Sequence, residues 1–459
     1  MNNDNELNSL RLGIPDILLP KSGYMSKWPV IACDQYTQDR GYWKKVKDYA
    51  GDSPSTINLI FPEIFLNDAD ADKRIIDIHS DMNRYLKDGV FNKPFNGFIY
   101  IERDTPYQKK RRGLVAAIDL EHYDWHPDAR PLIRCTEGTV PERLPPRMDI
   151  RRGAPLELPH TLLLIDDDKD ELLPVLGEIA KKNDPVYDTR LMMDSGRVTG
   201  WHISAENDGK PADAMLHIVN KLDELSKRSI TRYGAGNNEP FLFAVGDGNH
   251  SLAAAKGIWN EIKNELISRG EEPTHPCRFA LAEIENIYDP AIQFEPIHRL
   301  IFDIGFDNTI TLLSTLPDFS YKIVNNEQEL SSLVSGANAK ENGAGNIFGV
   351  ISKGRYALIK TSASGIATAC LQPILDEYQA LNMGTERASN CIDYIHDEKE
   401  LFRLSAAGNR GTAGILLPPV EKSGLFDTVA RLGPLPRKSF SMGHSREKRF
   451  YLECRRINN

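Results

Sequence analysis

Residues 241–256, FLFAVGDGNHSLAAAK, join two segments of opposite character. The run Phe241–Val245 is short and apolar, as in a buried strand, and the residues after Ser251 are small and favour a helix. Between them lie two glycines with an aspartate, an asparagine, a histidine and a serine. The stretch therefore predicts a strand that enters a helix through a polar glycine turn. Such a turn is either a ligand site or a tight turn capped by Asn249 or Ser251.

The composition is that of an ordinary globular protein. The chain has 459 residues, of which 41% are hydrophobic and 26% charged, enough for roughly two to three domains of about 150 residues. A net charge of −9 argues against a general nucleic-acid binder. The six cysteines are scattered without a CxxC pair, and no apolar run approaches the length of about 20 residues that a membrane helix needs. We therefore expect a soluble, cytoplasmic protein with no membrane partner.

Strand and helix patterns mix along the whole chain. Residues 68–88 and 211–229 have the helical spacing of apolar residues, whereas 97–104 and 110–120 resemble two strands joined by a turn. The predicted fold class is therefore α/β or α+β, with mixed sheets and flanking helices.

A polar connector over residues 227–240 favours a division into two domains. We expect an N-terminal α/β domain over 1–235 and a C-terminal α/β domain over 236–459 that carries the glycine turn. Residues 124–160 are rich in Pro, Arg and Gly and predict a long irregular loop in the first domain.

The residue types of the glycine turn suit phosphate chemistry. Gly246 and Gly248 tolerate positive φ and let a ligand approach the backbone closely. The helix that follows presents free N–H groups and the positive end of its dipole, which favour a phosphate. Asp247 can hold a magnesium ion or act as a base, and His250 can donate to a phosphate oxygen or transfer a proton.

Several segments together resemble the domain-of-unknown-function 1015 family, which is often labelled loosely with partition-protein names. Residues 247–251, DGNHS, look like the family's DGHHR motif. Residues 295–300 (EPIHRL) resemble its PTHRL element, and 436–440 (PRKSF) its MPxKST element. Residues 98–104 resemble a segment ending in RLE, and 136–139 (TEGT) an HExT element. These elements stand in the family's order from about residue 15 to about residue 453.

The DGHHR element is in turn similar to the phosphate-binding motif of ParB, sulfiredoxin and the ParB-like serine kinases. The resemblance implies a ParB/sulfiredoxin-like strand–turn–helix unit in which the turn cradles nucleotide phosphates. This sequence departs from the motif at Asn249, which replaces a histidine, and at Ser251, which replaces the arginine. Loss of that guanidinium removes a bidentate phosphate contact.

Other basic residues are candidates to replace the missing arginine, and each has a structural alternative. Arg147 and Arg151 lie in PPRMDIRRG, which is otherwise a solvated loop with an ion pair. Arg299 is otherwise part of a buried hydrogen-bonded pair with His298. Lys438 and Ser439 lie in a basic C-terminal segment, which is otherwise an ordinary strand face.

Three further positions are more ambiguous. Glu137 in CTEGTV can deprotonate a hydroxyl group, or it is an exposed loop glutamate. His160 precedes an apolar strand pattern, where a structural histidine is expected. Cys33 and Asp34 lie in a CDQY element to which the sequence assigns no mechanism.

Two functions follow from the motifs and the resemblance. The first is an enzyme of phosphoryl chemistry, a kinase or phosphohydrolase acting on a small hydroxyl compound such as serine or phosphoserine, with Mg²⁺ and a nucleotide. In this picture Gly248, Asn249 and Ser251 hold phosphate, Asp247 holds the metal, and Asp247, His250 and Glu137 are catalytic. The alternative is a nucleotide-binding, ParB-like regulator. It would need a basic helix-turn-helix, which the sequence does not contain, and nucleic acid is not an expected partner.

Overall fold

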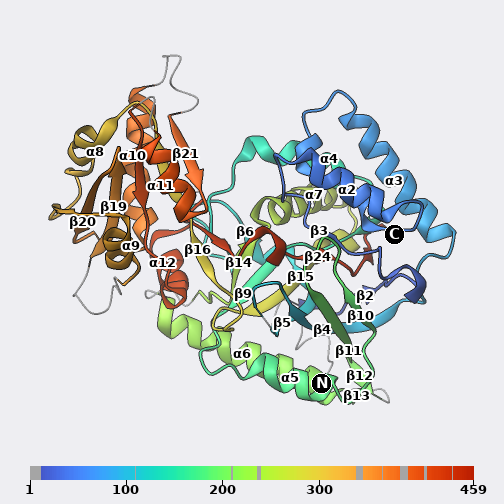
Figure 1. Ribbon diagram of the computed structural model, residues 1–459. Coiled ribbons are helices and arrows are strands. Elements are labelled where there is room, and N and C mark those ends of the chain that lie inside the picture. Colours follow the sequence, from blue (N-terminus) through green and yellow to red (C-terminus); the bar gives the residue numbers. More distant parts are fainter. Residues whose placement is uncertain are drawn as a thin grey trace. The chain divides into compact units, whose positions relative to one another are not determined.

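The computed structural model describes residues 12–108, 110–207, 210–234, 239–336, 345–363, 365–382, 391–407, 411–436 and 438–458. These residues divide into two compact units (Figure 1). The first unit comprises Met1–Gln293 and Met442–Asn459, and the second comprises Phe294–Ser441. The chain therefore leaves the first unit, builds the second, and returns to the first with its last residues.

The helices of the first unit are α2 (Arg40–Ala50), α3 (Ala71–Lys87), α4 (Leu144–Arg151), α5 (Leu172–Ala180), α6 (Asp213–Tyr233) and α7 (Asn249–Ser268). Its strands are β1 (Leu12–Gly13), β2 (Asp16–Ile17), β3 (Val30–Ile31), β4 (Phe95–Asp104), β5 (Arg111–Asp119), β6 (Tyr123–Asp124), β7 (Ile133–Cys135), β8 (Leu156–Glu157), β9 (Leu162–Ile165), β10 (Tyr187–Arg190), β11 (Arg197–Ser204), β12 (Glu206–Asn207), β13 (Lys210–Pro211), β14 (Phe243–Asp247), β15 (Phe279–Asn286), β24 (Phe450–Tyr451) and β25 (Arg455–Arg456).

One large mixed sheet organises the first unit. Its strand order is β10-β11-β4-β5-β15-β9-β14-β7-β6, with β1 added on β5 and β2 on β4. Strands β11, β4, β5 and β15 are antiparallel neighbours, whereas β15 runs parallel to β9, and β14 runs parallel to β7 and antiparallel to β9. This mixture of helices and strands confirms the predicted fold class.

Alternating side chains of β4 and β5 supply both faces of the sheet with apolar residues. Phe98 and Tyr100 belong to a core shared with α5, α6 and part of α7, and Ile99 and Ile101 belong to a second core shared with α2 and α3. This alternation follows from the period of two along a strand. A sheet covered on both faces has strands that are apolar throughout, which is why 98–101 and 114–118 are continuous apolar runs.

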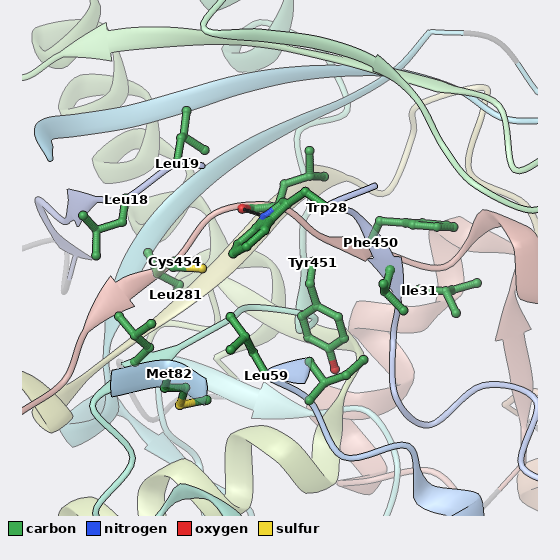
Figure 2. Close-up of a cluster of buried hydrophobic side chains, with 14 of the residues drawn as sticks. Leu18, Leu19, Trp28, Ile31, Leu59, Met82, Leu281, Phe450, Tyr451 and Cys454 are labelled. Atoms are coloured by element: carbon green, nitrogen blue, oxygen red, sulfur yellow. Dashed lines mark hydrogen bonds between the residues drawn. The ribbon is translucent and has the colours of Figure 1, made fainter. Parts of the chain in front are cut away.

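The C-terminal segment 442–458 completes the second core. Figure 2 shows Phe450, Tyr451 and Cys454 among apolar side chains that include Trp28 and Met82. β24 pairs with β3 and β25 pairs with β8, and the Trp28 indole Nε1 donates to the Leu452 carbonyl at 2.8 Å. Residues more than 400 positions apart in sequence therefore form one core.

The second unit contains a six-stranded sheet of its own. The strands of that sheet are β17 (His298–Ile301), β18 (Ser320–Val324), β19 (Asn346–Ser352), β20 (Arg355–Thr361), β21 (Ile392–Ile395) and β22 (Ala413–Leu416). Two further strands, β16 (Phe294–Pro296) and β23 (Phe440–Met442), pair with each other, and β23 ends in the first residue of the returning segment. The unit also contains five α-helices among the described residues. Its helices are α8 (Gly305–Leu313), α9 (Glu327–Ser335), α10 (Ala367–Leu381), α11 (Glu398–Ala406) and α12 (Leu425–Leu432). The sheet order is β18-β20-β19-β22-β17-β21.

Two expectations about organisation differ from the observed elements. The predicted boundary at residue 235 falls between α6 and β14 inside the first unit, because β14 pairs with β7 and β9 in the large sheet. The predicted long loop over 124–160 contains β7, α4 and β8. Pro145 and Pro146 stand in the first turn of α4, where a missing backbone N–H costs no helix hydrogen bond.

No helix in the described parts of the chain combines the length and the apolar character that crossing a bilayer requires.

Candidate functional site

The glycine turn joins β14 to α7 in the predicted strand–turn–helix order. Gly248 is the N-cap residue of α7 with φ 82° and ψ 25°, and no side chain caps the helix. The expectation that Asn249 or Ser251 caps the turn is therefore wrong, since both residues lie inside the helix. A Cβ on Gly248 would stand 3.0 Å from the Thr161 Cα atom. Because no side chain caps α7, its first backbone N–H groups have no acceptor within the helix.

Gly248→Ala is expected to destabilise the first unit by about 2 kcal/mol, because it combines a left-handed backbone with a steric clash. Gly270→Ala is the matched control: Gly270 also has positive φ, but a Cβ there would meet nothing within 4 Å. It should cost only about 1 kcal/mol. All five tryptophans lie in the first unit, so urea unfolding followed by tryptophan fluorescence measures both. Equal losses would contradict the clash.

Asp247 forms an ion pair at the start of α7. Its Oδ1 accepts from the Gly248 N–H at 2.9 Å, and its Oδ2 lies 3.2 Å from the Lys448 Nζ. The Lys448 side chain is 9% exposed and comes from the returning C-terminal segment. Arg103 holds this segment by donating to the Glu447 and Lys448 carbonyls at 2.9 and 2.5 Å. A cation is thereby fixed beside the positive end of a helix.

Ser251, in the first turn of α7, belongs to a hydrogen-bonded chain. Its Oγ lies 2.9 Å from His160 Nε2, and His160 Nδ1 lies 2.9 Å from the Tyr451 hydroxyl. The Tyr451 hydroxyl in turn accepts from the Cys33 N–H at 3.2 Å. His160 is buried and uses both ring nitrogens, so the expected structural histidine also holds a hydroxyl of the turn.

Acidic groups from the N-terminal part of the chain face this hydrogen-bonded chain. Burial acts to raise the pKa of Asp34, but His160, a hydrogen bond from Gln35 and Lys448 hold that pKa below its usual range. Burial is also the largest influence on Glu63 and raises its pKa, against the lowering effect of its ion-pair partner Arg147. Two carboxyl groups with opposite pKa shifts in one cluster are typical of acid–base sites.

His250, Asn249 and Glu137 lie in or beside the turn. His250 Nε2 accepts from the Val140 N–H at 3.3 Å, so the proton of the neutral ring lies on Nδ1. The Asn249 Oδ1 atom is buried with no hydrogen-bond partner in the part of the chain that the structure describes. Glu137 follows β7, whose carboxyl end lies beside that of β14 because the two strands are parallel. Glu137 and Asp247 therefore stand at the same sheet edge.

The other predicted phosphate ligands are not gathered at the turn by the contacts that they make. Arg147 reaches Glu63 within the cluster, but Arg151 pairs with buried Glu157 at 2.5 Å. Arg299 lies in the second unit, fully buried, where it donates to Gln372 and the Ile297 carbonyl and lies over the Tyr394 ring.

Lys438 and Ser439 also belong to the second unit. Ser439 is buried and donates to the Pro436 carbonyl at 2.6 Å, whereas Lys438 is exposed with φ 59°. Arg437, the second residue of PRKSF, lies outside the described residues.

Sequence reasoning assigned no site role to Asp34, Glu63, His160, Lys448 or Tyr451. They come from four distant parts of the chain and meet only through strand pairing such as β24 with β3. The available signals were the polar CDQY element beside an apolar run and the basic excess of residues 431–459.

The magnesium prediction rests on Asp247 alone. Among the described residues, no group of three or more His, Cys, Asp or Glu side chains could hold a metal ion. Mg²⁺ usually binds through one or two carboxylates together with substrate phosphates, so a single aspartate fits a metal that arrives with a nucleotide.

Comparison with known proteins identifies the family. The family described as protein of unknown function (DUF1015) matches residues 17–378. The chain belongs to this family. No curated protein matches it.

Solved structures show only a distant likeness. A conserved hypothetical protein from Pyrococcus furiosus is 12% identical, with 75% of this chain and 95% of that chain covered and a TM-score of 0.33. A free serine kinase in complex with AMP is 11% identical, with 77% and 95% covered and a TM-score of 0.35. C-terminally truncated SbnI from Staphylococcus aureus is 9% identical, with 75% and 85% covered and a TM-score of 0.32. Scores this low transfer neither a site nor an activity.

Proposed function

We propose that this protein is an enzyme of phosphoryl chemistry that acts on a small hydroxyl compound, with the phosphate held at the turn Asp247–Ser251. The observation that carries the proposal is the Lys448 ammonium, 3.2 Å from the Asp247 carboxylate at the uncapped N-terminus of α7. A cation, a helix dipole and the first backbone N–H groups of a helix at one point are the features that bind phosphate. Lys448 thereby takes the place of the arginine that the motif has at the position of Ser251.

The Ser251–His160–Tyr451 chain supports a site that handles a hydroxyl group. His160 makes a hydrogen bond at each ring nitrogen and thereby fixes the Ser251 hydroxyl in the first turn of α7. Glu137 remains the proposed base for the substrate hydroxyl, and Glu63, whose pKa is raised, is a second acid–base group.

Three further roles belong to the proposal. Gly248 lets phosphate approach the backbone, Asn249 donates from its side-chain Nδ2, and His250 donates from Nδ1 to a phosphate oxygen. If bound, Mg²⁺ would be held by Asp247 and would neutralise phosphate charge. Serine or phosphoserine is the proposed substrate and a nucleotide the proposed cofactor. Kinase and phosphohydrolase activity both use this arrangement, because both stabilise charge on the same phosphoryl group.

The test is a thermal-shift titration of the full chain, read by tryptophan fluorescence, with ATP, ADP, AMP and phosphoserine, each with and without Mg²⁺. We expect at least one phosphorylated ligand to stabilise the wild type. Lys448→Met should weaken that ligand about tenfold, the usual worth of one charge-assisted contact, and Asp247→Ala should abolish the effect of Mg²⁺. Lys44→Met, which removes an exposed lysine paired with Asp48, is the control and should change nothing.

Turnover then distinguishes the two reactions. ATP with serine should give phosphoserine if the enzyme is a kinase, and phosphoserine alone should give serine and phosphate if it is a phosphohydrolase; mass spectrometry measures both. The proposal is wrong if no phosphorylated ligand stabilises the wild type, or if Lys448→Met and Asp247→Ala respond like Lys44→Met.

A further inference from the structure

The second unit contains a cavity of about 580 Å³ whose lining lies entirely within Phe294–Ser441. Its wall combines the start of α10, the start of β19, the end of β20, the proline-rich segment 417–421 and α12. None of the residues proposed for phosphoryl chemistry in the first unit contributes to it. A cavity of this volume is in the range that holds a small molecule.

The N-terminus of α10 opens into this cavity. The N-cap residue Ile366 has extended backbone dihedrals, and no side chain caps the helix. Asn346 fixes the preceding turn by donating to the Ala363 and Gly365 carbonyls at 2.7 and 3.0 Å. The first N–H groups of this 15-residue helix therefore have no acceptor within it.

Thr368, in the first turn of α10, marks the same point with a second polar group. The residue lines the cavity and is 2% exposed, yet its Oγ1 has no hydrogen-bond partner among the described residues. Buried hydroxyl groups are nearly always paired, and exceptions need an explanation. A ligand oxygen at the helix N-terminus would supply the missing partner.

Two charged lining residues have no ion-pair or side-chain hydrogen-bond partner in the described ranges of the chain. Lys360 on β20 and Glu421 make no ion pair with any described residue, whereas Arg431 pairs with Asp427, and Asp318 accepts from Ser362. As far as the chain is described, the lining thus offers one cation and one anion that form neither an ion pair nor a side-chain hydrogen bond within the protein. Ile347, Leu417 and other apolar side chains form much of the remaining wall.

We propose that this cavity binds a small α-amino acid with an apolar side chain. Its carboxylate lies at the N-terminus of α10, where it accepts from the Thr368 hydroxyl and pairs with Lys360. Its ammonium group pairs with Glu421, and its side chain contacts the apolar wall. One cation and one anion in a single lining match the carboxylate and ammonium groups of an amino acid.

Isothermal titration calorimetry of the full chain tests the proposal with leucine, valine and methionine as probes. We expect binding of at least one, weakened about tenfold by Thr368→Val or Lys360→Met. Thr368→Val keeps the side-chain shape and removes a hydroxyl without a partner, so the unfolding midpoint should not fall. Lys322→Met, on the neighbouring strand β18, removes an exposed lysine outside the lining and is the control.

The role of Glu421 is tested with 4-methylpentanoate, which is leucine without its amine. The wild type should prefer leucine about tenfold, and Glu421→Gln should lose this preference. Asp247→Ala should bind leucine like the wild type, which separates this cavity from the proposed phosphoryl site. The inference is overturned if none of the probes binds, if inorganic phosphate binds and leucine does not, or if Thr368→Val and Lys360→Met bind like Lys322→Met.

Discussion

Arg449→Met is expected to destabilise the first unit by about 3–5 kcal/mol. Arg449 is 2% exposed, pairs with Glu283 and with Glu453 (2.6 Å), and donates from Nε to the Pro159 carbonyl at 3.0 Å. Its removal leaves two carboxylates in the interior, and the cost of an uncompensated buried charge exceeds that of lost packing. Urea unfolding followed by tryptophan fluorescence measures the loss in this unit.

Arg152→Met is the matched control for this prediction. Arg152 also contacts two carboxylates, those of Asp149 and Glu261, but its side chain is 49% exposed. Water compensates the two acids when the guanidinium is removed, so the expected loss is below about 1 kcal/mol. If Arg449→Met costs no more than Arg152→Met, the buried pairing does not stabilise the fold.

Acidification from pH 7 to pH 5 should destabilise the second unit by about 2 kcal/mol through His298 alone. Burial, and then the charge of Arg299, lower the pKa of His298 to about 4, and its Nδ1 accepts from the Leu417 N–H at 3.1 Å. The unfolded histidine titrates near 6.5. The stabilisation is therefore complete above pH 6.5, falls as the unfolded chain binds the proton, and levels off below about pH 4.

His298→Asn isolates this contribution, since only the difference between variant and wild type belongs to His298. Unfolding is followed by circular dichroism, with the tryptophan signal reporting the first unit separately. The stability of the wild type should decline more steeply between pH 7 and pH 5 than that of the variant. Parallel declines would show that folding does not lower the pKa of His298.

Single helices and the strand–turn–helix unit could be predicted from the sequence, because each is determined by the pattern of apolar and polar residues within one continuous segment. The strand–turn–helix over β14 and α7 is written in one contiguous pattern, and the helix predicted at 68–88 is observed as α3, Ala71–Lys87. The family resemblance was confirmed by the match over 17–378. The likeness of the turn itself to ParB and sulfiredoxin stays a prediction.

The non-local part could not be predicted, for a physical reason. The returning segment packs closely on the turn, since a Cβ on Gly246 would stand 2.4 Å from the Met442 Sδ, and Lys448 of the same segment reaches Asp247. Pairings between residues hundreds of positions apart leave no periodic trace in either segment. The basic excess near the C-terminus was visible, but Arg449 and Arg455 neutralise interior acids, whereas Lys448 stands at the turn.

The return of residues 442–458 to the first unit sets an order of events during synthesis. The ribosome completes β14 and α7, and then the whole of Phe294–Ser441, before it makes Lys448 and Tyr451. Until then the core around Trp28 lacks Phe450 and Cys454, and Ser251 and His160 lack Tyr451. A chain that stops before residue 442 therefore carries the glycine turn without its cation and without part of its core. The proposed site can therefore be completed only after both units have been synthesised.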